Sequence, residues 1–212
     1  MKLMTPRLPV EFSAPDMNLD DDELLLHGVS QTKGAIFETE ASKRYIEQSY
    51  FSSVQFSRNV WHGVDIQDVV FERCDFSNVD FQDAVMHRVQ FKQCKMTGAQ
   101  FGGSTMRHVR FEDCMGKMVA FNFMSGKHLI FLNSSLEQGD FIEATLQKTA
   151  FQHCQLEDAN FSEVDMNGID LSTCTFDRLT VSIDQLRGLK LTSEQAVGFA
   201  RMLGISIVDE ST

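Results

Sequence analysis

Proline, tryptophan and tyrosine are scarce in this chain of 212 residues. It has 3 Pro, 1 Trp and 2 Tyr against 18 Phe. All three prolines (Pro6, Pro9 and Pro15) lie at the amino end. Because proline lacks the backbone N–H that a sheet ladder needs, its absence after Pro15 favours hydrogen-bonded strands over most of the chain.

An excess of basic charge is also missing. Lys and Arg number 19 and Asp and Glu 30, so the net charge is −11. This argues against direct binding of nucleic acid, because nucleic-acid-binding proteins carry a basic surface. The sequence contains no apolar run of about eighteen residues, so it predicts no membrane span. The first residues contain no apolar stretch typical of a signal peptide. Five cysteines without a CxxC pair argue against a disulfide framework or a zinc knuckle. We therefore expect a cytoplasmic protein with free thiols.

Apolar residues recur at every fifth position from Phe51 to Leu186. Of the 28 positions in this series, 26 are large and apolar, and 14 of the 18 Phe fall in it. Two residues before each of them lies a second series of mostly small residues, such as Val54, Cys74 and Ala99. A period of five fits neither a helix nor a simple strand. It requires a backbone that turns a corner every five residues, with both series facing inward.

A period of twenty lies above the period of five. All five cysteines differ by multiples of twenty, and positions 51, 71, 91, 111, 131 and 151 are all phenylalanine.

The stretches CDFSN (74–78), ANFSE (159–163) and IDLST (169–173) share a small-polar-Phe/Leu-polar-polar pattern. In this pattern the chain resembles the pentapeptide repeat proteins, over residues 51 to about 186. The resemblance implies an all-β fold, a right-handed quadrilateral β-helix (pentapeptide repeat solenoid), with four pentapeptides, or twenty residues, in each coil. Coils stacked at the strand spacing of ~4.8 Å would build a rod, ~34 Å long for about seven coils. A short C-terminal helix is expected beside it. The expected organisation is an extended N-terminal segment over 1–23, degenerate first coils or an N-terminal cap over 24–50, the repeat β-helix over 51–186, and a C-terminal cap and dimerisation segment over 187–212.

Glycine interrupts the apolar series at positions 116 and 126, where nearby small positions are enlarged to Met124 and Leu129. One interpretation is a compensating repacking of the interior. The other is a bulged loop that presents apolar side chains to a partner. These candidate partner contacts are Met115, Met118 and Phe123.

Both ends of a β-helix expose unpaired strand edges that need a cover. At the carboxyl end, TSEQ (192–195) predicts a capping box that begins a helix, Gly204 a helix stop, and residues 205–208 a short strand. This helix either caps its own rod or packs on a twin across a two-fold axis, which would make a homodimer. The candidate dimerisation residues are Leu191, Ala196, Phe199 and Leu203. Near the amino end, a short helix over 38–48 is an alternative to degenerate coils.

Outward residues can be sorted by side once the coil is assigned. One side carries acidic residues and no Lys or Arg: Asp80, Asp83, Asp140, Glu143 and Glu163. The next side carries basic residues and histidines: Arg88, Arg107, Lys127, Lys148, Arg187, His87, His108 and His128. Either side is also compatible with an ordinary solvated surface. The histidines lack a carboxylate that would complete a metal site. No catalytic or cofactor motif is present, so we expect no enzyme and no cofactor.

The carboxyl end, from Leu171 through Leu191 to Ile205, is similar to that of the quinolone-resistance (Qnr-type) branch, especially Gram-positive chromosomal members. This resemblance implies binding to DNA gyrase or topoisomerase IV, protection from quinolones, and a dimer formed by C-terminal elements. An acidic rod would compete with DNA phosphates for a basic groove. The projecting loops of Gram-negative members have no clear counterpart here. The alternative hypothesis is a β-helical scaffold or protein-interaction module with no topoisomerase role.

Overall fold

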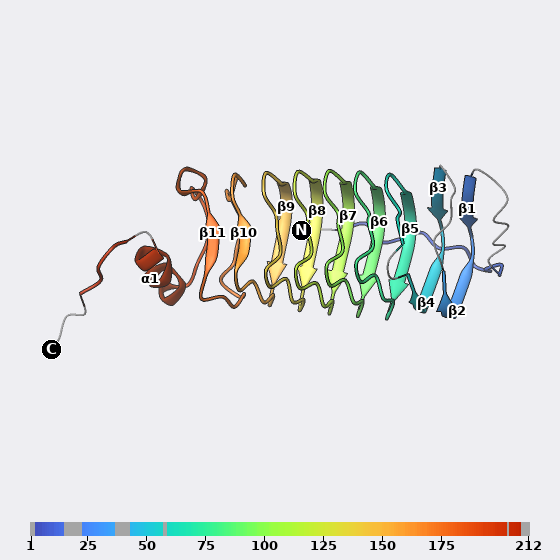
Figure 1. The fold of residues 1–212 in the computed structure, drawn as a ribbon, viewed down its shortest axis with the longest axis horizontal. Coiled ribbons are helices and arrows are strands. Elements are labelled where there is room, and N and C mark those ends of the chain that lie inside the picture. The colour runs from blue at the N-terminus through green and yellow to red at the C-terminus, as the bar shows by residue number, and fades with distance from the viewer. Residues whose placement is uncertain (1–2, 15–22, 37–42, 57–58, 203, 209–212) are drawn as a thin grey trace.

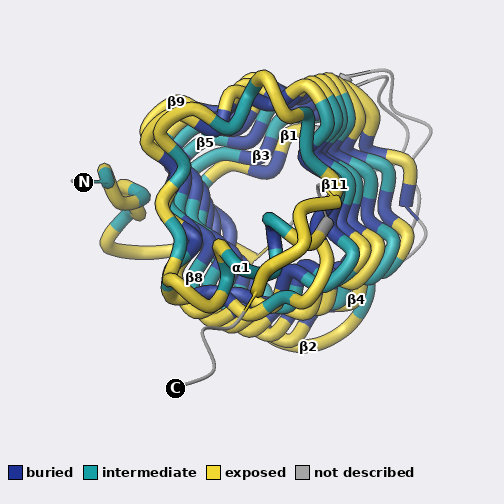
Figure 2. Tube along the Cα trace, turned by 90° about the vertical axis from the view of Figure 1, so that its left-hand side faces the viewer, coloured by how far each residue is buried: buried dark blue, intermediate teal, exposed yellow. Residues whose placement is uncertain are grey.

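The structure, a computed structural model, describes residues 3–14, 23–36, 43–56, 59–202 and 204–208. The chain winds into a rod with the first coils at one end and a helix at the other (Figure 1). Along its axis the rod has a roughly square outline with buried residues on every side (Figure 2). The expected right-handed quadrilateral β-helix with a short C-terminal helix is confirmed.

Every strand pair among the described residues is parallel, and each residue pairs with the residue twenty positions further on. This register confirms the coil length predicted from the sequence. The main sheet runs β1-β3-β5-β6-β7-β8-β9, with β2 paired to β4 and β4 to β5, while β10 pairs with β11. The elements are β1 (Glu23–His27), β2 (Ser30–Ala35), β3 (Lys43–Glu47), β4 (Tyr50–Gln55), β5 (Asp65–Glu72), β6 (Val85–Lys92), β7 (Thr105–Glu112), β8 (Ser125–Leu132), β9 (Thr145–Gln152), β10 (Ala159–Phe161), β11 (Leu179–Val181), a 3-10 turn (Ile183–Gln185) and α1 (Ser193–Met202).

Phenylalanine rings fill the interior in stacked columns. The ring of Phe111 lies 5.0 Å from that of Phe91 and 4.9 Å from that of Phe131, in both cases with 3° between the ring planes. Phe121, in the next column, meets Phe111 edge-on at 5.7 Å and 73°. Stacked and edge-to-face pairs of this kind each add ~0.5–1.5 kcal/mol to the stabilisation from burial. The period of twenty therefore places identical rings where they stabilise one another.

The five cysteines are free and buried, as expected. The thiols of Cys74, Cys94, Cys114 and Cys154 donate to backbone carbonyls of the preceding coil; Cys94 Sγ, for example, donates to Phe71 O at 3.5 Å. The column is thus part of the packed interior.

Corners of the coil use the left-handed backbone region. The residue two positions after a member of the buried series of every fifth residue usually has a positive φ. Examples are 56° at Asp83, 57° at His108 and 60° at Phe123. Asn, Asp, His and Gly tolerate this conformation best, and they are common at this position. Larger side chains also occupy this position, among them Met118 and Phe123.

The interior repacks around Gly116 and Gly126, and the backbone forms no bulge there. A Cβ on Gly126 would lie 2.5 Å from Leu129 Cδ1, because the buried Leu129 side chain occupies that space. The ladder continues through this segment, with Met115 bridged to the residues twenty positions before and after it. The prediction of a bulged loop is therefore wrong. The three residues assigned to it occupy regular outward positions of one coil.

Further coils precede Phe51. Leu26 and Ile46 pair in register across β1 and β3, and both side chains are fully buried. The alternative of a helix over 38–48 is wrong for Lys43–Glu47, which form β3. Residues 37–42 lie outside the described part of the chain.

Residues 3–14 form an arm that runs along the rod axis and across the strands (Figure 1). The Met4 N–H donates to His108 Nδ1 at 3.3 Å, the Arg7 N–H to Asp68 Oδ1 at 2.9 Å, and the Ser13 N–H to Gly28 O at 2.9 Å. The arm therefore crosses the coils from β7 back to β1. Its prolines leave it without a ladder of its own, which suits an extended strap.

Helix α1 covers the open end of the last coil. The predicted capping box is confirmed, because Thr192 Oγ1 accepts the Gln195 N–H at 3.2 Å and Gln195 Oε1 accepts the Thr192 N–H at 2.9 Å. Gly204, with φ of 78°, ends the helix through the bonds of its own N–H to Arg201 O and of the Ile205 N–H to Ala200 O. The strand predicted over 205–208 is wrong, since this segment has no strand pairing.

Candidate interaction surfaces

The predicted acidic residues lie on one side of the rod, in two groups. Asp80 and Asp140 share a column, linked by successive bridges through Gln100 and Ala120. Three coil steps separate them, which is ~14 Å at the usual strand spacing. Because the intervening coils carry uncharged residues in this column, the acidic side is not continuous.

The two aspartates of this column also shape their own coils. Asp80 Oδ1 accepts the Gln82 N–H at 2.8 Å, and Asp140 Oδ1 accepts the Ile142 N–H at 3.3 Å. Such bonds from a side chain to the backbone two residues on stabilise a turn. Both side chains are half-buried, so part of their function is structural.

The other three predicted acids are exposed and occupy one corner column. Asp83, Glu143 and Glu163 have φ values of 56°, 54° and 59°, so their side chains leave the rod in the same direction. Asp83 Oδ2 lies 3.3 Å from His62 Nε2, and Glu163 Oε1 accepts the Ser182 hydroxyl at 2.8 Å. Of the five predicted acids, these three carboxylates are therefore the more accessible to a partner. We call this column, together with Phe123, the acidic corner.

Gly103 and Phe123 occupy the gap between Asp83 and Glu143 in the acidic corner. Phe123 stands one coil before Glu143 and two coils after Asp83, and 61% of it is exposed. Met118, 51% exposed, lies at the other corner of this side, and Met115, 57% exposed, lies on the adjacent side. The structure therefore brings Phe123 together with the acidic residues and leaves the two methionines apart. Sequence reasoning had assigned the three apolar residues to one loop.

The neighbouring side is basic. Strands β6–β9 contain six Lys or Arg and one carboxylate, Glu112, so their net charge is 6 − 1 = +5 with histidine neutral. The rings of His108 and His128 stack at 4.6 Å, and those of His87 and His108 lie 6.1 Å apart. Burial, reinforced by nearby positive charges, lowers the pKa of all three histidines. No group of three His, Cys, Asp or Glu within the described residues is arranged to hold a metal ion.

A buried ion pair anchors the N-terminal arm on this side. Arg88 Nε lies 2.5 Å from Asp68 Oδ1 and Nη2 lies 2.6 Å from Oδ2. Burial raises the pKa of Asp68, but the bonds from Arg88 and from the Arg7 N–H outweigh it and hold that pKa below its usual value. The charge of Arg88 is therefore neutralised by Asp68 inside the protein. No local sequence pattern indicated this pair.

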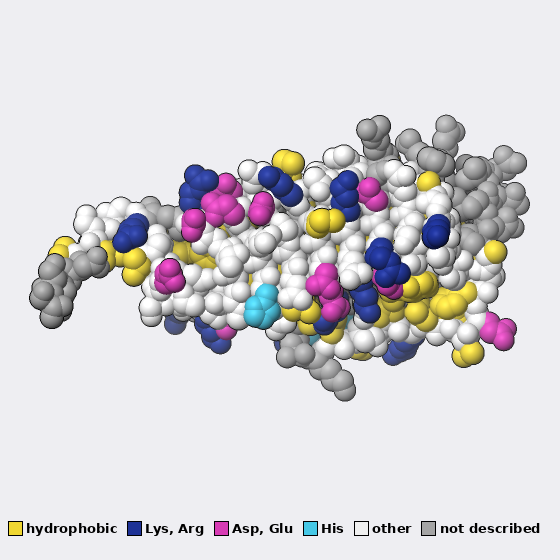
Figure 3. Space-filling model, turned by 90° about the horizontal axis from the view of Figure 1, so that it is seen from below, with side chains coloured by type: hydrophobic (Ala, Val, Ile, Leu, Met, Phe, Trp, Pro, Cys, Tyr) yellow, Lys and Arg dark blue, Asp and Glu magenta, His cyan; other side chains and the backbone are white. Residues whose placement is uncertain are grey.

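Basic and acidic side chains alternate on the side of the rod in Figure 3. The ion pairs Lys95–Asp75, Lys117–Glu137 and Arg178–Glu157 neutralise charges of this kind. Exposed pairs contribute only ~0–1 kcal/mol each to stability. The acidic corner and the basic strands stand out against this mixed surface.

The predicted dimerisation residues have different surroundings. Phe199 is only 6% exposed, because its ring packs edge-on against Phe176 of the same chain at 6.0 Å. Leu191 is half-buried against the same core, and Ala196 is exposed. Leu203 lies outside the described residues. Phe199 therefore belongs to the cap of its own rod.

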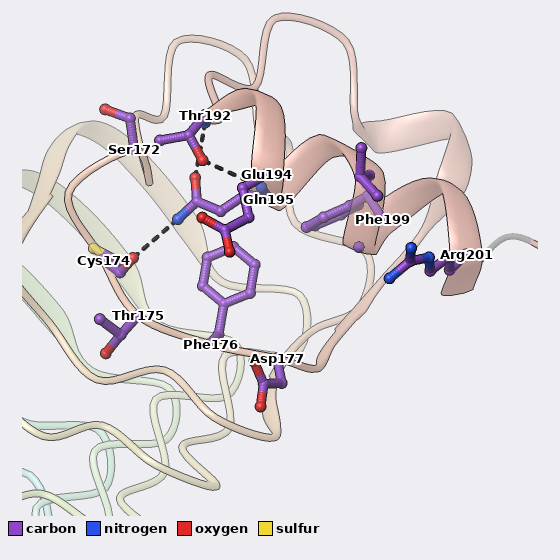
Figure 4. A pocket seen from close by; sticks show the side chains of 12 residues that line it. Ser172, Cys174, Thr175, Phe176, Asp177, Thr192, Glu194, Gln195, Phe199 and Arg201 are labelled. Carbon is purple, nitrogen blue, oxygen red and sulfur yellow. Dashed lines mark hydrogen bonds between the residues drawn. The ribbon is translucent and has the colours of Figure 1, made fainter. Parts of the chain in front are cut away.

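A cleft of about 900 Å³ opens between α1 and the last coil (Figure 4). Phe176, Phe199 and Arg201 line it. Gln195 closes one end, because its Nε2 donates to Leu171 O at 3.0 Å and to Cys174 O at 2.9 Å. These bonds pair carbonyls that the end of the solenoid would otherwise leave free.

Exposed apolar residues follow the helix. Ile205 and Val208 are 55% and 86% exposed, and Ile183 of the preceding 3-10 turn is also exposed. Sequence reasoning missed them as contact candidates, although three apolar residues within 205–208 were a visible signal. In the described part of the chain, no helix is long and apolar enough to span a bilayer.

The sequence matches two family models, described as "pentapeptide repeat region" over residues 64–141 and "pentapeptide repeats (8 copies)" over residues 140–178. Comparison with curated proteins finds no match.

Among solved structures, the chain is similar to HetL, a pentapeptide repeat protein involved in heterocyst differentiation regulation from the cyanobacterium Nostoc sp. strain PCC 7120. The TM-score is 0.61 at 12% identity, over 81% of this chain and 85% of HetL. A trypsin-treated form of QnrB1, a plasmid-mediated fluoroquinolone resistance protein, aligns with a TM-score of 0.45 at 22% identity, over 88% of this chain and 98% of that one. At these identities the likeness concerns the fold.

Proposed function

Because the chain belongs to the pentapeptide repeat family, we propose that it is a non-enzymatic rod that binds a type II topoisomerase, DNA gyrase or topoisomerase IV. The acidic corner docks on the basic surface with which that enzyme holds DNA. Docking there protects the enzyme from quinolones. The proposed partner acts on bacterial DNA, which places the protein in the cytoplasm.

The acidic corner is the observation that carries this proposal. Asp83, Glu143 and Glu163 point outward from a rigid backbone, and Phe123 stands among them. Carboxylates held in a fixed row imitate the charge of a phosphate backbone, while an exposed aromatic ring supplies an apolar anchor at the centre of an interface. The Qnr-like carboxyl end noted in the sequence supports the choice of partner.

We also propose that two chains join through the carboxyl end. Val208 and Ile205 are exposed there, next to the cap, and apolar residues in such a position favour burial against a second copy. Two rods joined end to end would present two acidic corners to a symmetric enzyme.

Binding of purified gyrase or topoisomerase IV to the immobilised protein tests the proposal. The variant Asp83→Asn/Glu143→Gln/Glu163→Gln removes three charges with little change of shape. Since charge complementarity drives the contact, we expect affinity to fall by about tenfold or more, and binding to the wild type to weaken with salt.

A matched control removes three exposed acids elsewhere, in the variant Asp113→Asn/Asp184→Asn/Glu194→Gln. It makes the same change in net charge and should bind nearly as the wild type. Equal losses in both variants would mean that net charge, and not the acidic corner, governs binding. No binding by the wild type would favour a scaffold without a topoisomerase partner.

A further inference from the structure

The basic strands β6–β9 form a surface whose charge opposes that of the whole chain. Their net charge of +5, which includes the buried Arg88 paired with Asp68, lies within a protein of −11, so the remaining residues carry −11 − 5 = −16. This contrast marks the surface as a distinct feature. This surface is separate from the acidic corner, and its role does not depend on topoisomerase binding.

Its exposed cations stand in consecutive coils. Arg107 pairs in register with Lys127, and Lys148 occupies the corner of the next coil. Among the ion pairs of the described residues, none involves these three side chains. One cation therefore follows another at every coil step of ~4.8 Å. We call these three residues with His87, His108 and His128 the cationic array.

Hydrogen-bond donors border the array along the beginnings of strands β7, β8 and β9. Thr105, Ser125 and Thr145 lie in register in β7, β8 and β9 and present a row of hydroxyl groups. On the other side, Lys92 lines a cleft of about 430 Å³ beside the N-terminal arm, together with Arg110 and Glu112, which pair with each other at 2.9 Å. Lys92 therefore adds a donor on this flank, and Glu112 is the single carboxylate in the four strands.

The histidines add a titratable charge to the array. His128 Nδ1 is buried with no hydrogen-bond partner, and His108 Nδ1 only accepts the N–H of Met4. The groups that face His108 are His87 and Arg88 from β6, Lys127 and His128 from β8, and the arm through Met4. Lys148 from β9 and Lys127 face His128. Burial and then the positive neighbours lower the pKa of the His108 ring, and a bound anion would raise it.

From these observations we infer that the cationic array binds inorganic polyphosphate, lying along the rod axis. Consecutive phosphates are joined by one bridging oxygen, so a chain laid across the coils offers an anion to every cation in any register. Phosphates of a nucleotide strand are separated by a whole sugar, so they match this closely repeated row of cations less well. Arginine, lysine and hydroxyl donors all suit phosphate oxygens.

Calorimetric titration of the full-length protein with a polyphosphate of defined length tests the inference. The variant Arg107→Gln/Lys127→Gln/Lys148→Gln should bind about tenfold more weakly or worse, because it loses three phosphate contacts. The control Lys95→Gln/Lys117→Gln/Arg178→Gln removes the same charge from exposed ion pairs. It should bind within about twofold of the wild type. Circular dichroism confirms that both variants remain folded.

The pH dependence gives a second readout. Binding should tighten as the pH falls from about 8 to about 6, because the histidines gain charge near the bound anion. The variant His108→Gln/His128→Gln should lose most of this dependence and keep binding at pH 8. Failure of the wild type to bind polyphosphate at low salt would overturn the inference. So would equal binding of single-stranded DNA or poly-glutamate of the same charge, or equal losses in the two lysine–arginine variants.

Discussion

Replacing Phe121 with alanine removes one ring from the middle of the stacked interior. Phe121 is 1% exposed. Its neighbours are four other rings, two stacked and two edge-on, with centroids at 5.1, 5.0, 5.7 and 5.5 Å: Phe101, Phe141, Phe111 and Phe131. Core substitutions of this kind cost ~3–5 kcal/mol of unfolding free energy. The backbone ladder fixes the coil spacing, so the cavity cannot collapse, and we expect the upper half of that range.

Phe123→Ala provides the matched control, because it makes the same chemical change two residues away at an exposed corner. We expect its unfolding free energy to lie within about 0.5 kcal/mol of the wild type. Urea denaturation followed by circular dichroism measures both variants, with an unchanged slope required for the comparison. A loss below about 1 kcal/mol for Phe121→Ala, or similar losses for the two variants, would refute the assignment of inward and outward positions.

Four further changes test other parts of the structure. Gln195→Glu removes the two bonds donated to the last coil and should cost ~1–3 kcal/mol, seen as faster amide exchange in α1. Gly126→Ala overfills the space of Leu129 and should cost ~1–3 kcal/mol, which Leu129→Val should largely restore. The pKa of Asp68 lies below its unfolded value, so the stabilisation that ionised Asp68 gives to arm docking is fully present above about pH 4 and is lost as the pH falls through the folded pKa; Asp68→Asn should loosen the arm at every pH in exchange experiments. Val208→Asp should shift the mass from dimer to monomer in sedimentation, and an unchanged mass would exclude a dimer through this segment.

The repeat made most of the fold predictable, because its two periods report directly on backbone geometry. A side chain every five residues, with the same type every twenty, has few solutions other than a four-sided coil. The capping box was also predictable, since its bonds join Thr192 to Gln195, three residues away. Interactions between residues so close in the chain can be predicted from a sequence motif.

The rest depended on contacts between distant residues. The arm is held by Arg7 on Asp68 and Met4 on His108, across 61 and 104 positions of the chain, and no local pattern encodes such pairs. Burial of Phe199 against its own rod likewise depends on where the last coil ends. The acidic residues were found from their spacing alone, but the gap that Gly103 and Phe123 occupy became visible only when the corner column was traced through the coils.

Supercoiling by DNA gyrase in the presence of ciprofloxacin tests the central claim most directly. Titration of this protein should restore supercoiling, and the variant Asp83→Asn/Glu143→Gln/Glu163→Gln should restore little, while the matched control variant acts like the wild type. No restoration by the folded wild-type protein, with gyrase or with topoisomerase IV in the corresponding decatenation assay, would contradict the proposed protection.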